Sequence, residues 1–353
     1  MERKGGGREL KGLAWLLCLT GIYGIFLAAI SILNWYGADR FWLGALNLYL
    51  PQALWALPGI ILAILIFQTE RSWVWLPLLC VAWVLGPLMG FCWSAQSGQA
   101  ESNPVTVRVM TWNIKYGSYD LAPLMAEISR SRPDVVLFQD AVQSMNAELG
   151  EYFQQWQVCS HGQFVIASRF PLSGLEVLPL PASGEGQEYL RCRMRIGQSL
   201  VTLYNVHFRT PRRSLNALRS ARTNPWYLPE AIQIFDHNIN TRLSQAISVQ
   251  ADLRREKGPV ILAGDLNSPD ASRVCATLRD AGLQDAYAQR GRGYGFTYGH
   301  LLFKYRLPWL RVSWMRIDHI MTSAHFRAER CWAGTGEASD HRPVIADLVL
   351  QRP

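Results

Sequence analysis

Hydrophobic and polar positions follow different patterns on the two sides of residue 100. The first part contains three long apolar segments with almost no charge, roughly Leu13–Leu33, Leu50–Phe67 and Trp73–Trp93. Each is close to the length of about 20 residues that a helix needs to cross a bilayer. Pro51 and Pro58 interrupt the second segment, but neighbouring helices can satisfy the backbone groups that proline leaves free. The pattern predicts a membrane domain over residues 1–94 with three transmembrane helices.

Two alternatives compete with this interpretation. A cleavable signal peptide would explain the first segment, but its apolar stretch is long for that purpose and no clear small-residue cleavage site follows it. Buried helices of a soluble protein would explain all three, but three such segments in succession carry almost no charge. Tryptophans near the segment ends also suit a membrane interface: Trp35, Trp42, Trp73, Trp75 and Trp93.

The distribution of basic residues predicts the orientation, because short cytoplasmic flanks are rich in Lys and Arg. Four basic residues precede or open the first segment: Arg3, Lys4, Arg8 and Lys11. The first loop carries only Arg40, the second turn carries Arg71, and residues 95–104 carry none. We expect a cytoplasmic N-terminus in the cell membrane and, after three crossings, everything beyond residue 95 outside. Four basic residues of the chain lie in this N-terminal flank, where they suit an anionic leaflet, so the formal net charge of +8 is weak evidence for nucleic-acid binding.

Residues 95–104 are rich in Ser, Gly, Gln and Ala, which predicts a linker. Strand-like and helix-like runs alternate after it. The expected strands are Val105–Trp112, Val135–Phe138, Phe164–Ser168, Leu190–Ile196, Leu200–Val206, Val260–Ala263, Ile317–Thr322 and Val344–Leu350. The expected helices are Leu121–Ser131 and Thr241–Lys257. The order predicts an α/β fold over residues 105–353, a sandwich of two sheets with helices outside.

The seven cysteines do not form a metal-binding pattern, since no Cys-x-x-Cys or Cys/His zinc spacing occurs. Four of them follow the membrane part: Cys159, Cys192, Cys275 and Cys331. Disulfides and free buried thiols both remain open for these four.

Polar side chains lie at or next to the ends of six expected strands. They are Asn113, Gln139 with Asp140, His207, Asp265 with Asn267, Asp318 with His319, and Asp340 with His341. One such ending is ordinary turn chemistry, but six ends that converge would form a cluster of oxygen and imidazole ligands. Such a cluster suits Mg²⁺ better than zinc, because no tight His/Cys triplet is present. The chain lacks the signatures of a serine hydrolase, a P-loop, a dinucleotide fold and a zinc protease.

Together these segments resemble the endonuclease/exonuclease/phosphatase superfamily, which has the DNase I-like fold. The matching segments are 111-TWNIKYG-117, 134-DVVLFQD-140, 163-QFVIASRFPL-172, 204-YNVHF-208, 264-GDLNSP-269, 316-RIDHI-320 and 339-SDHRPV-344. They occur in the family's order within residues 105–350. The resemblance implies a four-layer α/β sandwich with a Mg-dependent phosphatase or phosphodiesterase site at one end of the two sheets.

The resemblance also implies a metal site. Asn113 and Asp140 would hold Mg²⁺, or Mn²⁺ as the alternative, with Asp340 nearby. The family normally has Glu where this chain has Asp140. The carboxylate is kept but reaches less far by one methylene, and Mg²⁺ is strict about geometry. We therefore expect the choice or the position of the metal to differ.

The remaining roles implied by the resemblance concern the phosphate and the attacking water. Asp265 would orient or deprotonate the water, and Asn267 would bind the phosphate. His341 would contact the scissile phosphate, oriented by Asp318. His207 would be a second phosphate contact or the acid for the leaving group, and Glu188 is a candidate to orient it.

The other histidines carry no functional expectation. His319 follows Asp318 on a strand and should face away from the site. Four more lack a matching motif and are expected to be structural or exposed: His161, His237, His300 and His325.

Two insertions bear on the substrate. Residues 209–240 carry five arginines followed by 225-PWYLPEAIQIF-235, and residues 301–314 mix Leu, Phe and Trp with Lys304, Arg306 and Arg311. Basic and apolar residues together suit a surface at the level of lipid headgroups, and arginine can clamp a diphosphate. Ordinary loops packed on the domain are the alternative.

Three hypotheses for function follow. The first is a lipid-phosphate or lipid-diphosphate hydrolase acting outside the membrane. The chain is similar to the membrane-anchored bacterial branch that includes an undecaprenyl-diphosphate phosphatase tied to teicoplanin resistance. The second is an extracellular nuclease, with nucleic acid as partner, and the third is a non-catalytic membrane scaffold.

Overall fold

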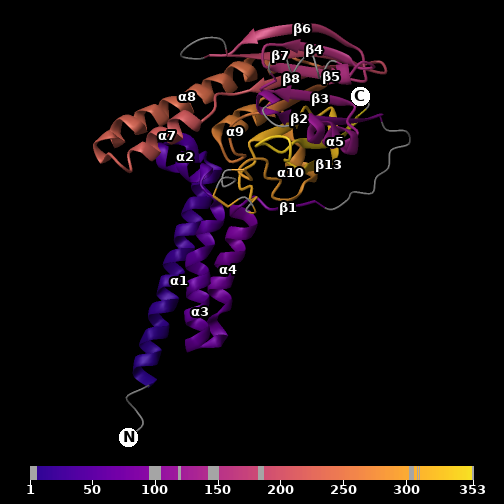
Figure 1. The fold of residues 1–353 in the computed structure, drawn as a ribbon. Coiled ribbons are helices and arrows are strands. Elements are labelled where there is room, and N and C mark those ends of the chain that lie inside the picture. The colour runs from indigo at the N-terminus through magenta and orange to yellow at the C-terminus, as the bar shows by residue number, and fades with distance from the viewer. Residues whose placement is uncertain are drawn as a thin grey trace.

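The computed structural model describes residues 6–94, 105–117, 121–141, 151–181, 187–301, 306–307, 309 and 311–351. Figure 1 shows a sheet-containing domain from which a stalk of helices projects. The linker expected at residues 95–104 lies outside the described residues.

Three apolar helices of the stalk are long enough to cross a membrane. The candidate spans are Leu10–Trp35, Gln52–Thr69 and Arg71–Leu88, and only 17–28 % of each apolar window is buried within the chain. They contain α1 (Gly6–Trp35), α3 (Ala56–Thr69), α4 (Trp75–Trp83), the short helices η2 (Gln52–Trp55) and η3 (Arg71–Trp73), and the π-helical turn η4 (Val84–Leu88). The chain therefore has the outward-facing apolar surface expected of membrane association.

The segment between α1 and α3 belongs to the junction between the stalk and the other domain. It forms η1 (Ala38–Arg40) and α2 (Trp42–Tyr49). Beyond the third span, Cys92–Trp93 forms a short strand, β1, which pairs with β11 (Arg292–Gly293). The third span was expected to continue to Trp93, but it ends at Leu88 because the chain there turns to join the domain.

The domain contains two six-stranded sheets. The first has the order β10-β12-β9-β8-β7-β6, and the second has the order β13-β14-β2-β3-β5-β4. The strands of the first are β10 (Gln284–Asp285), β12 (Asp318–Thr322), β9 (Val260–Asp265), β8 (Ser199–His207), β7 (Glu188–Ile196) and β6 (Leu172–Pro179). Those of the second are β13 (Phe326–Ala333), β14 (Val344–Leu350), β2 (Val105–Asn113), β3 (Val135–Gln139), β5 (Phe164–Ser168) and β4 (Gln157–His161).

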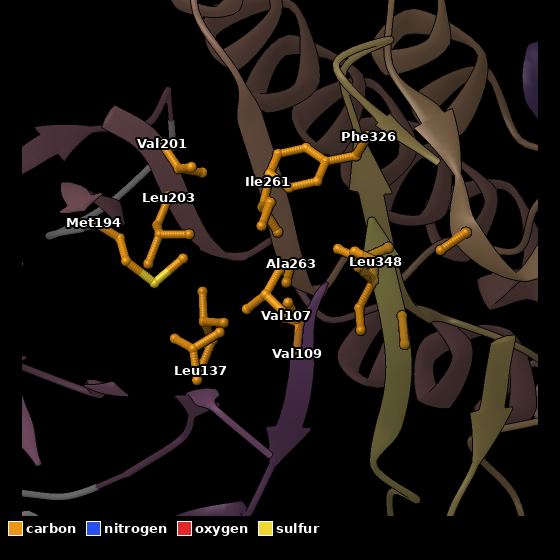
Figure 2. Packing of buried hydrophobic residues seen from close by; sticks show 14 of the residues in the cluster. Val107, Val109, Leu137, Met194, Val201, Leu203, Ile261, Ala263, Phe326 and Leu348 are labelled. Atoms are coloured by element: carbon orange, nitrogen blue, oxygen red, sulfur yellow. The ribbon is translucent and has the colours of Figure 1, made fainter. Parts of the chain in front are cut away.

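Apolar side chains of the two sheets meet in the main core. Figure 2 shows Val107 and Leu137 of the second sheet near Ile261 and Leu203 of the first. Because successive side chains of a strand point to opposite faces, the other face of each sheet needs its own cover. Helices supply it, with α8 (Leu228–Leu253) and α9 (Arg273–Arg279) on the first sheet and α5 (Leu121–Ser131) on the second. The result is the predicted four-layer sandwich, helix–sheet–sheet–helix.

The remaining helices lie around one end of the sandwich or at its edges. They are η5 (Lys115–Gly117), α7 (Arg212–Ser220), η6 (Pro225–Tyr227) and α10 (Ala286–Arg290). The stretch that was expected as an inserted loop, residues 209–240, is therefore mostly helical. The expected helix Thr241–Lys257 begins earlier, at Leu228, with a proline in the first turn where the missing N–H does no harm.

Strands β4, β6 and β13 were not expected. Strands β4 and β6 are largely exposed edge strands, so they lack the apolar run that marks a buried strand.

All seven cysteines, each within the described residues, are free thiols, which favours the thiol alternative.

Candidate functional site

The tips of two parallel strand pairs form the base of the site. Strands β2 and β3 run parallel with Asn113 opposite Gln139, and β8 and β9 run parallel with His207 opposite Asp265. Parallel neighbours end at the same edge of a sheet, so the polar residues that follow them gather there. A close backbone approach supports this arrangement, since a Cβ added at Gly264 would lie 1.9 Å from the Val206 carbonyl oxygen.

Asp265 lies at the centre of this cluster and is 1 % exposed. Its Oδ2 accepts a hydrogen bond from Asn113 Nδ2 at 3.0 Å, and its Oδ1 accepts one from the Asn267 backbone N–H at 2.8 Å. Burial and the nearby charge of Asp318 raise the pKa of Asp265 to about 6, while His341 and His207 act in the opposite direction. The carboxylate is therefore mostly ionised at neutral pH but is a stronger base than an exposed aspartate.

His341 and Asp318 form a buried pair beside Asp265. Asp318 opens β12, directly opposite Asp265 on β9, and its carboxylate accepts a hydrogen bond from His341 Nδ1 at 3.0 Å. The other ring nitrogen, Nε2, lies 3.8 Å from Asp265 Oδ2. Burial alone would lower the pKa of His341, but the charges of Asp318 and Asp265 outweigh it and raise that pKa to about 10. His341 is therefore an imidazolium at neutral pH.

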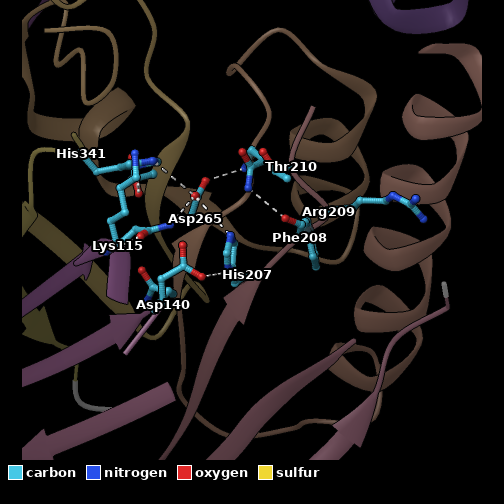
Figure 3. Close-up of polar contacts among 12 residues, drawn as sticks. Lys115, Asp140, His207, Phe208, Arg209, Thr210, Asp265 and His341 are labelled. Carbon is cyan, nitrogen blue, oxygen red and sulfur yellow. Dashed lines mark hydrogen bonds and ion pairs between the residues drawn. The ribbon is translucent and has the colours of Figure 1, made fainter. Parts of the chain in front are cut away.

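His207 bridges the two strand pairs (Figure 3). Its Nδ1 lies 2.6 Å from Gln163 Oε1 and 3.3 Å from Asp140 Oδ1, and its Nε2 lies 3.6 Å from Asp265 Oδ2. The suggestion that Glu188 orients this ring is wrong, because Glu188 instead contacts His161 at 3.4 Å. Gln163 has that role, and the only sequence signal for it was its place at the start of a matching motif.

Asn267, just after β9, has a left-handed backbone conformation with φ 48°. Its Nδ2 donates a hydrogen bond to the Phe208 carbonyl at 2.9 Å, and its own carbonyl accepts one from the Tyr49 hydroxyl, also at 2.9 Å. The amide side chain is thus held rigidly, with its second N–H left to bind a ligand oxygen.

Two buried carboxylate oxygens meet the requirement for a cation site. Asp140 Oδ1 and Asp340 Oδ1 are buried and accept no hydrogen bond within the described part of the chain, although His207 Nδ1 lies 3.3 Å from Asp140 Oδ1. Both residues line the same cavity as Asn113. Unpaired buried carboxylate oxygens are costly, and hard cations prefer such ligands. Asp265, Asp318 and His341 also offer ligand atoms within 4.8 Å of one another. Those three already satisfy one another, so the set of Asn113, Asp140 and Asp340 fits a divalent ion better.

The cavity above these residues has a volume of about 440 Å³ and is lined by groups that sequence reasoning missed. Lys115 Nζ lies 2.5 Å from Asp340 Oδ2, and Arg212 lies 3.6 Å from the same oxygen. Burial opposes ionisation of Asp340, but His341, Lys115 and Arg212 hold its pKa below the ordinary value. The Tyr298 ring lies tilted against the His341 ring, with centroids 4.8 Å apart. Lys115 follows the first motif and Arg212 belongs to the basic insertion, whereas Tyr298 had no signal.

His319 lies outside this cavity, as expected. Its Nδ1 is 2.9 Å from Asp285 and 3.1 Å from Arg316, in a separate buried ion network.

Comparison with known proteins identifies the fold and the family. Solved structures with the same fold include an endonuclease/exonuclease/phosphatase from Beutenbergia cavernae, with 20% identity, a TM-score of 0.51, and coverage of 70% of this chain and 72% of that one. Truncated Caenorhabditis elegans TDP2 has 18% identity and a TM-score of 0.54, over 69% of this chain and 98% of that one. D. rerio TDP2 complexed with a single-strand DNA product has 15% identity and a TM-score of 0.53, over 69% and 98%.

A curated relative from Vibrio campbellii, a UPF0294 protein, is 22% identical over 264 residues, which are 73% of this chain and 83% of the relative. Residues 110–341 match the endonuclease/exonuclease/phosphatase family, and this match covers more than half of the chain. Members of that family are hydrolases that act on phosphoester bonds and depend on divalent metal ions. The chain therefore belongs to the endonuclease/exonuclease/phosphatase family.

Proposed function

We propose that this protein is a membrane-anchored, metal-dependent phosphoester hydrolase whose substrate is a lipid phosphate or lipid diphosphate, such as undecaprenyl diphosphate. One observation carries the proposal. Tyr49, which lies between the first two candidate spans, lines the same cavity as Asp265, Asn267 and His341. The reaction site thus adjoins the membrane part of the chain, where a lipid headgroup would be presented.

The residues of the site fit the steps of phosphate hydrolysis. Asp265, rigidly held and ionised at neutral pH, accepts a proton from the attacking water. The His341 imidazolium and the Asn267 amide bind the phosphate oxygens, on which charge develops. His207 protonates the leaving group or contacts a second oxygen. Asn113, Asp140 and Asp340 would hold the divalent ion, Mg²⁺ or Mn²⁺, which when bound neutralises charge on the phosphate oxygens.

Two cations at the rim support a substrate with more than one phosphate. Lys115 and Arg212 line the cavity, and both are close to Asp340. A terminal phosphate at His341 would leave the next phosphate within the field of these side chains. Arginine binds such groups through two parallel hydrogen bonds.

Two exposed tryptophans in the two insertions support contact with headgroups. Trp226 is 92% exposed and Trp309 is 75% exposed. Figure 1 shows α7 and the beginning of α8 beside α2, close to the end of the spans. Tryptophan in such a place suits the membrane interface. Of the basic residues expected in the second insertion, Lys304 lies outside the described residues.

We further propose an extracytoplasmic position for the catalytic domain and a cytoplasmic N-terminus. The end of α1 and the end of η4 both lie at the domain, which agrees with three crossings that begin on the opposite side. Proteolysis of intact cells should cleave the domain from outside. Protection of the domain until the membrane is opened would reverse the orientation.

The proposed activity can be tested directly. Purified full-length protein in detergent should release phosphate from undecaprenyl diphosphate with Mg²⁺ or Mn²⁺, should lose this activity with a chelator, and should lack it as the Asp265→Ala variant. No release under any of these conditions would reject a lipid-diphosphate substrate.

A metal-dependent nuclease is the second candidate. One structural neighbour, D. rerio TDP2, was solved with a single-strand DNA product, and this chain carries arginines in α7. Plasmid nicking by the same preparation, lost in Asp265→Ala, would favour this candidate.

A further inference from the structure

A second cavity lies between the membrane helices and the catalytic domain. Its volume is about 460 Å³, within the range of roughly 300–1,000 Å³ that is usual for small-molecule sites. One wall comes from the ends of the three spans and from residues 89–92, which follow the third span. The opposite wall comes from residues 269–271 and 314–316 and from the aromatic residues Tyr294 and Phe296.

The walls of this cavity are fixed by contacts that join distant parts of the chain. The Tyr294 hydroxyl donates a hydrogen bond to the Leu85 carbonyl at 2.7 Å, and Phe91 contacts the Tyr294 ring edge-on at 5.2 Å between centroids. On the other side, the Arg273 backbone N–H donates to Asp39 at 2.9 Å. The cavity is therefore a built feature of the junction and not a gap between loosely placed parts.

The lining suits a hydrocarbon chain. It is mostly apolar, with Leu48, Leu88, Met89 and Phe296 among its members, and the charged residues Asp270 and Arg316 that also line it pair with each other at 3.1 Å. Phe91, at its rim, is 43% exposed, so apolar surface continues outward there. Since the three spans end at this cavity, it lies at the boundary between the membrane interior and the headgroups.

The cavity also adjoins the reaction site. Trp314 and Met315 line both cavities, and Leu48 of this one is followed by Tyr49 of the other. The Trp314 indole N–H donates a hydrogen bond to the Tyr49 carbonyl at 3.1 Å, which fixes the shared wall. An amphipathic molecule with its phosphate at His341 could therefore place the beginning of its chain here.

We propose that this junction cavity binds the hydrocarbon chain of the substrate next to its phosphate groups. The inference rests on the proposed function and adds to it the site that selects lipid-borne substrates over soluble phosphates. Water is the alternative occupant of this cavity, because two polar groups there need a hydrogen-bond partner. Asn34 Oδ1 and Gln52 Oε1 are buried in this region without a hydrogen-bond partner among the described residues, which water would satisfy.

The test is photo-crosslinking to the full-length protein in detergent. The probe is a farnesyl methylene-diphosphonate with a diazirine on its chain, which cannot be hydrolysed at the bridging position and so needs no activity. We expect adducts in residues 87–92 and 294–296, lost on competition with undecaprenyl diphosphate. Adducts confined to other parts of the chain would overturn the proposal.

Matched tryptophan substitutions give the control. Met89→Trp fills the cavity, whereas Leu85→Trp, about one turn earlier, adds the same ring at an exposed position outside it. Met89→Trp should abolish the adducts and Leu85→Trp should not. Ala271→Leu, on the opposite wall, serves the same purpose if Met89→Trp does not fold. Equal labelling of folded Met89→Trp or Ala271→Leu and of the unchanged protein would show that water, or nothing specific, fills the cavity.

Kinetics separates this proposal from the proposed function. Met89→Trp should lower kcat/KM for undecaprenyl diphosphate about tenfold or more, with little change for isopentenyl diphosphate, whose chain is too short to fill the cavity. An equal effect on both substrates would contradict the proposal while leaving the hydrolase intact. If neither substrate is hydrolysed, the proposed function fails, and the labelling pattern still decides whether the cavity binds a chain.

Discussion

The strand-tip end of the two-sheet domain and its junction with the apolar helices are built in different ways. At the strand tips, parallel pairing places His207 opposite Asp265, and packing of the two sheets brings Asn113 within hydrogen-bond distance of Asp265. At the junction, side chains from distant segments meet, as when the Tyr49 hydroxyl bonds the Asn267 carbonyl. In the proposed function, the first region positions the reacting groups and the second selects the substrate. Substitutions in the two regions should therefore affect activity and stability in different ways.

The largest effect is expected at the centre of the strand tips. Asp265→Asn removes the proposed base but keeps the size of the side chain, so kcat should fall by roughly 10²–10⁴-fold. Phosphate release measures it, and the exposed Asp280→Asn variant, which contacts none of the site residues, is the control. Retention of more than a tenth of the activity by a folded Asp265→Asn protein would remove Asp265 from the proposed role.

A smaller loss is expected when His341 loses its partner. Asp318→Asn should lower activity by about 10- to 100-fold, as for other groups that orient a catalytic side chain. The charge of Asp318 helps to raise the pKa of His341 to about 10, so the active imidazolium is present below that pH and is lost as pH rises through it. Without that charge the alkaline limb of the pH–rate profile should move to lower pH. An unmoved limb would show that His341 does not act in its charged form.

The strand-tip region could be predicted from the sequence because its information is local. An apolar run followed by an acid or amide is visible in the sequence at Val260–Asp265 and at Val105–Asn113. In the structure each of these two segments forms a single strand that ends at the polar residue. The positions of Gln163 and Lys115 could have been suspected from the same motifs. Their partners could not, since His207 and Asp340 lie on other segments of the chain.

The junction could not be predicted for the opposite reason. Residues 42–49 looked like a loop between two spans, but they form α2, and its Ala45 and Tyr49 pack against Phe235 of α8. Nothing in a sequence pattern relates these residues, which are separated by almost two hundred positions. The expected spans themselves were close to the candidate spans of the structure, because a continuous apolar run of about 20 residues is visible in the sequence itself.

A moderate effect is expected at the junction. Tyr49→Phe removes one buried hydroxyl and leaves the Asn267 carbonyl without this donor, which should cost about 1 kcal/mol. We expect a small drop in melting temperature in detergent and a fall in kcat of no more than about fivefold. Tyr36→Phe, at a tyrosine that is 63% exposed, should change neither. If the two variants behave alike, the membrane segment does not support the catalytic loop.

The smallest effect is expected where the chain departs from its family. Asp140 has a left-handed backbone, φ 49°, and aspartate tolerates this conformation better than most residues. That tolerance offers a physical reason for a shorter carboxylate at this position. Asp140→Glu should cost about 1 kcal/mol of stability and keep most of the activity at saturating metal. The metal concentration needed for half of that activity should change, because the carboxylate reaches further by one methylene.

Titration of the rate with Mg²⁺ and with Mn²⁺ measures the difference, and Asp140→Ala provides the comparison. If Asp140 is a ligand, the unchanged protein should bind the metal most tightly, Asp140→Glu less tightly and Asp140→Ala least. If the longer side chain fits the ion better, Asp140→Glu should bind it more tightly than the unchanged protein. If all three require the same metal concentration, Asp140 does not hold the ion. In that case Asp340 Oδ1, a buried oxygen of the same cavity that accepts no hydrogen bond within the described part of the chain, becomes the principal protein ligand together with Asn113.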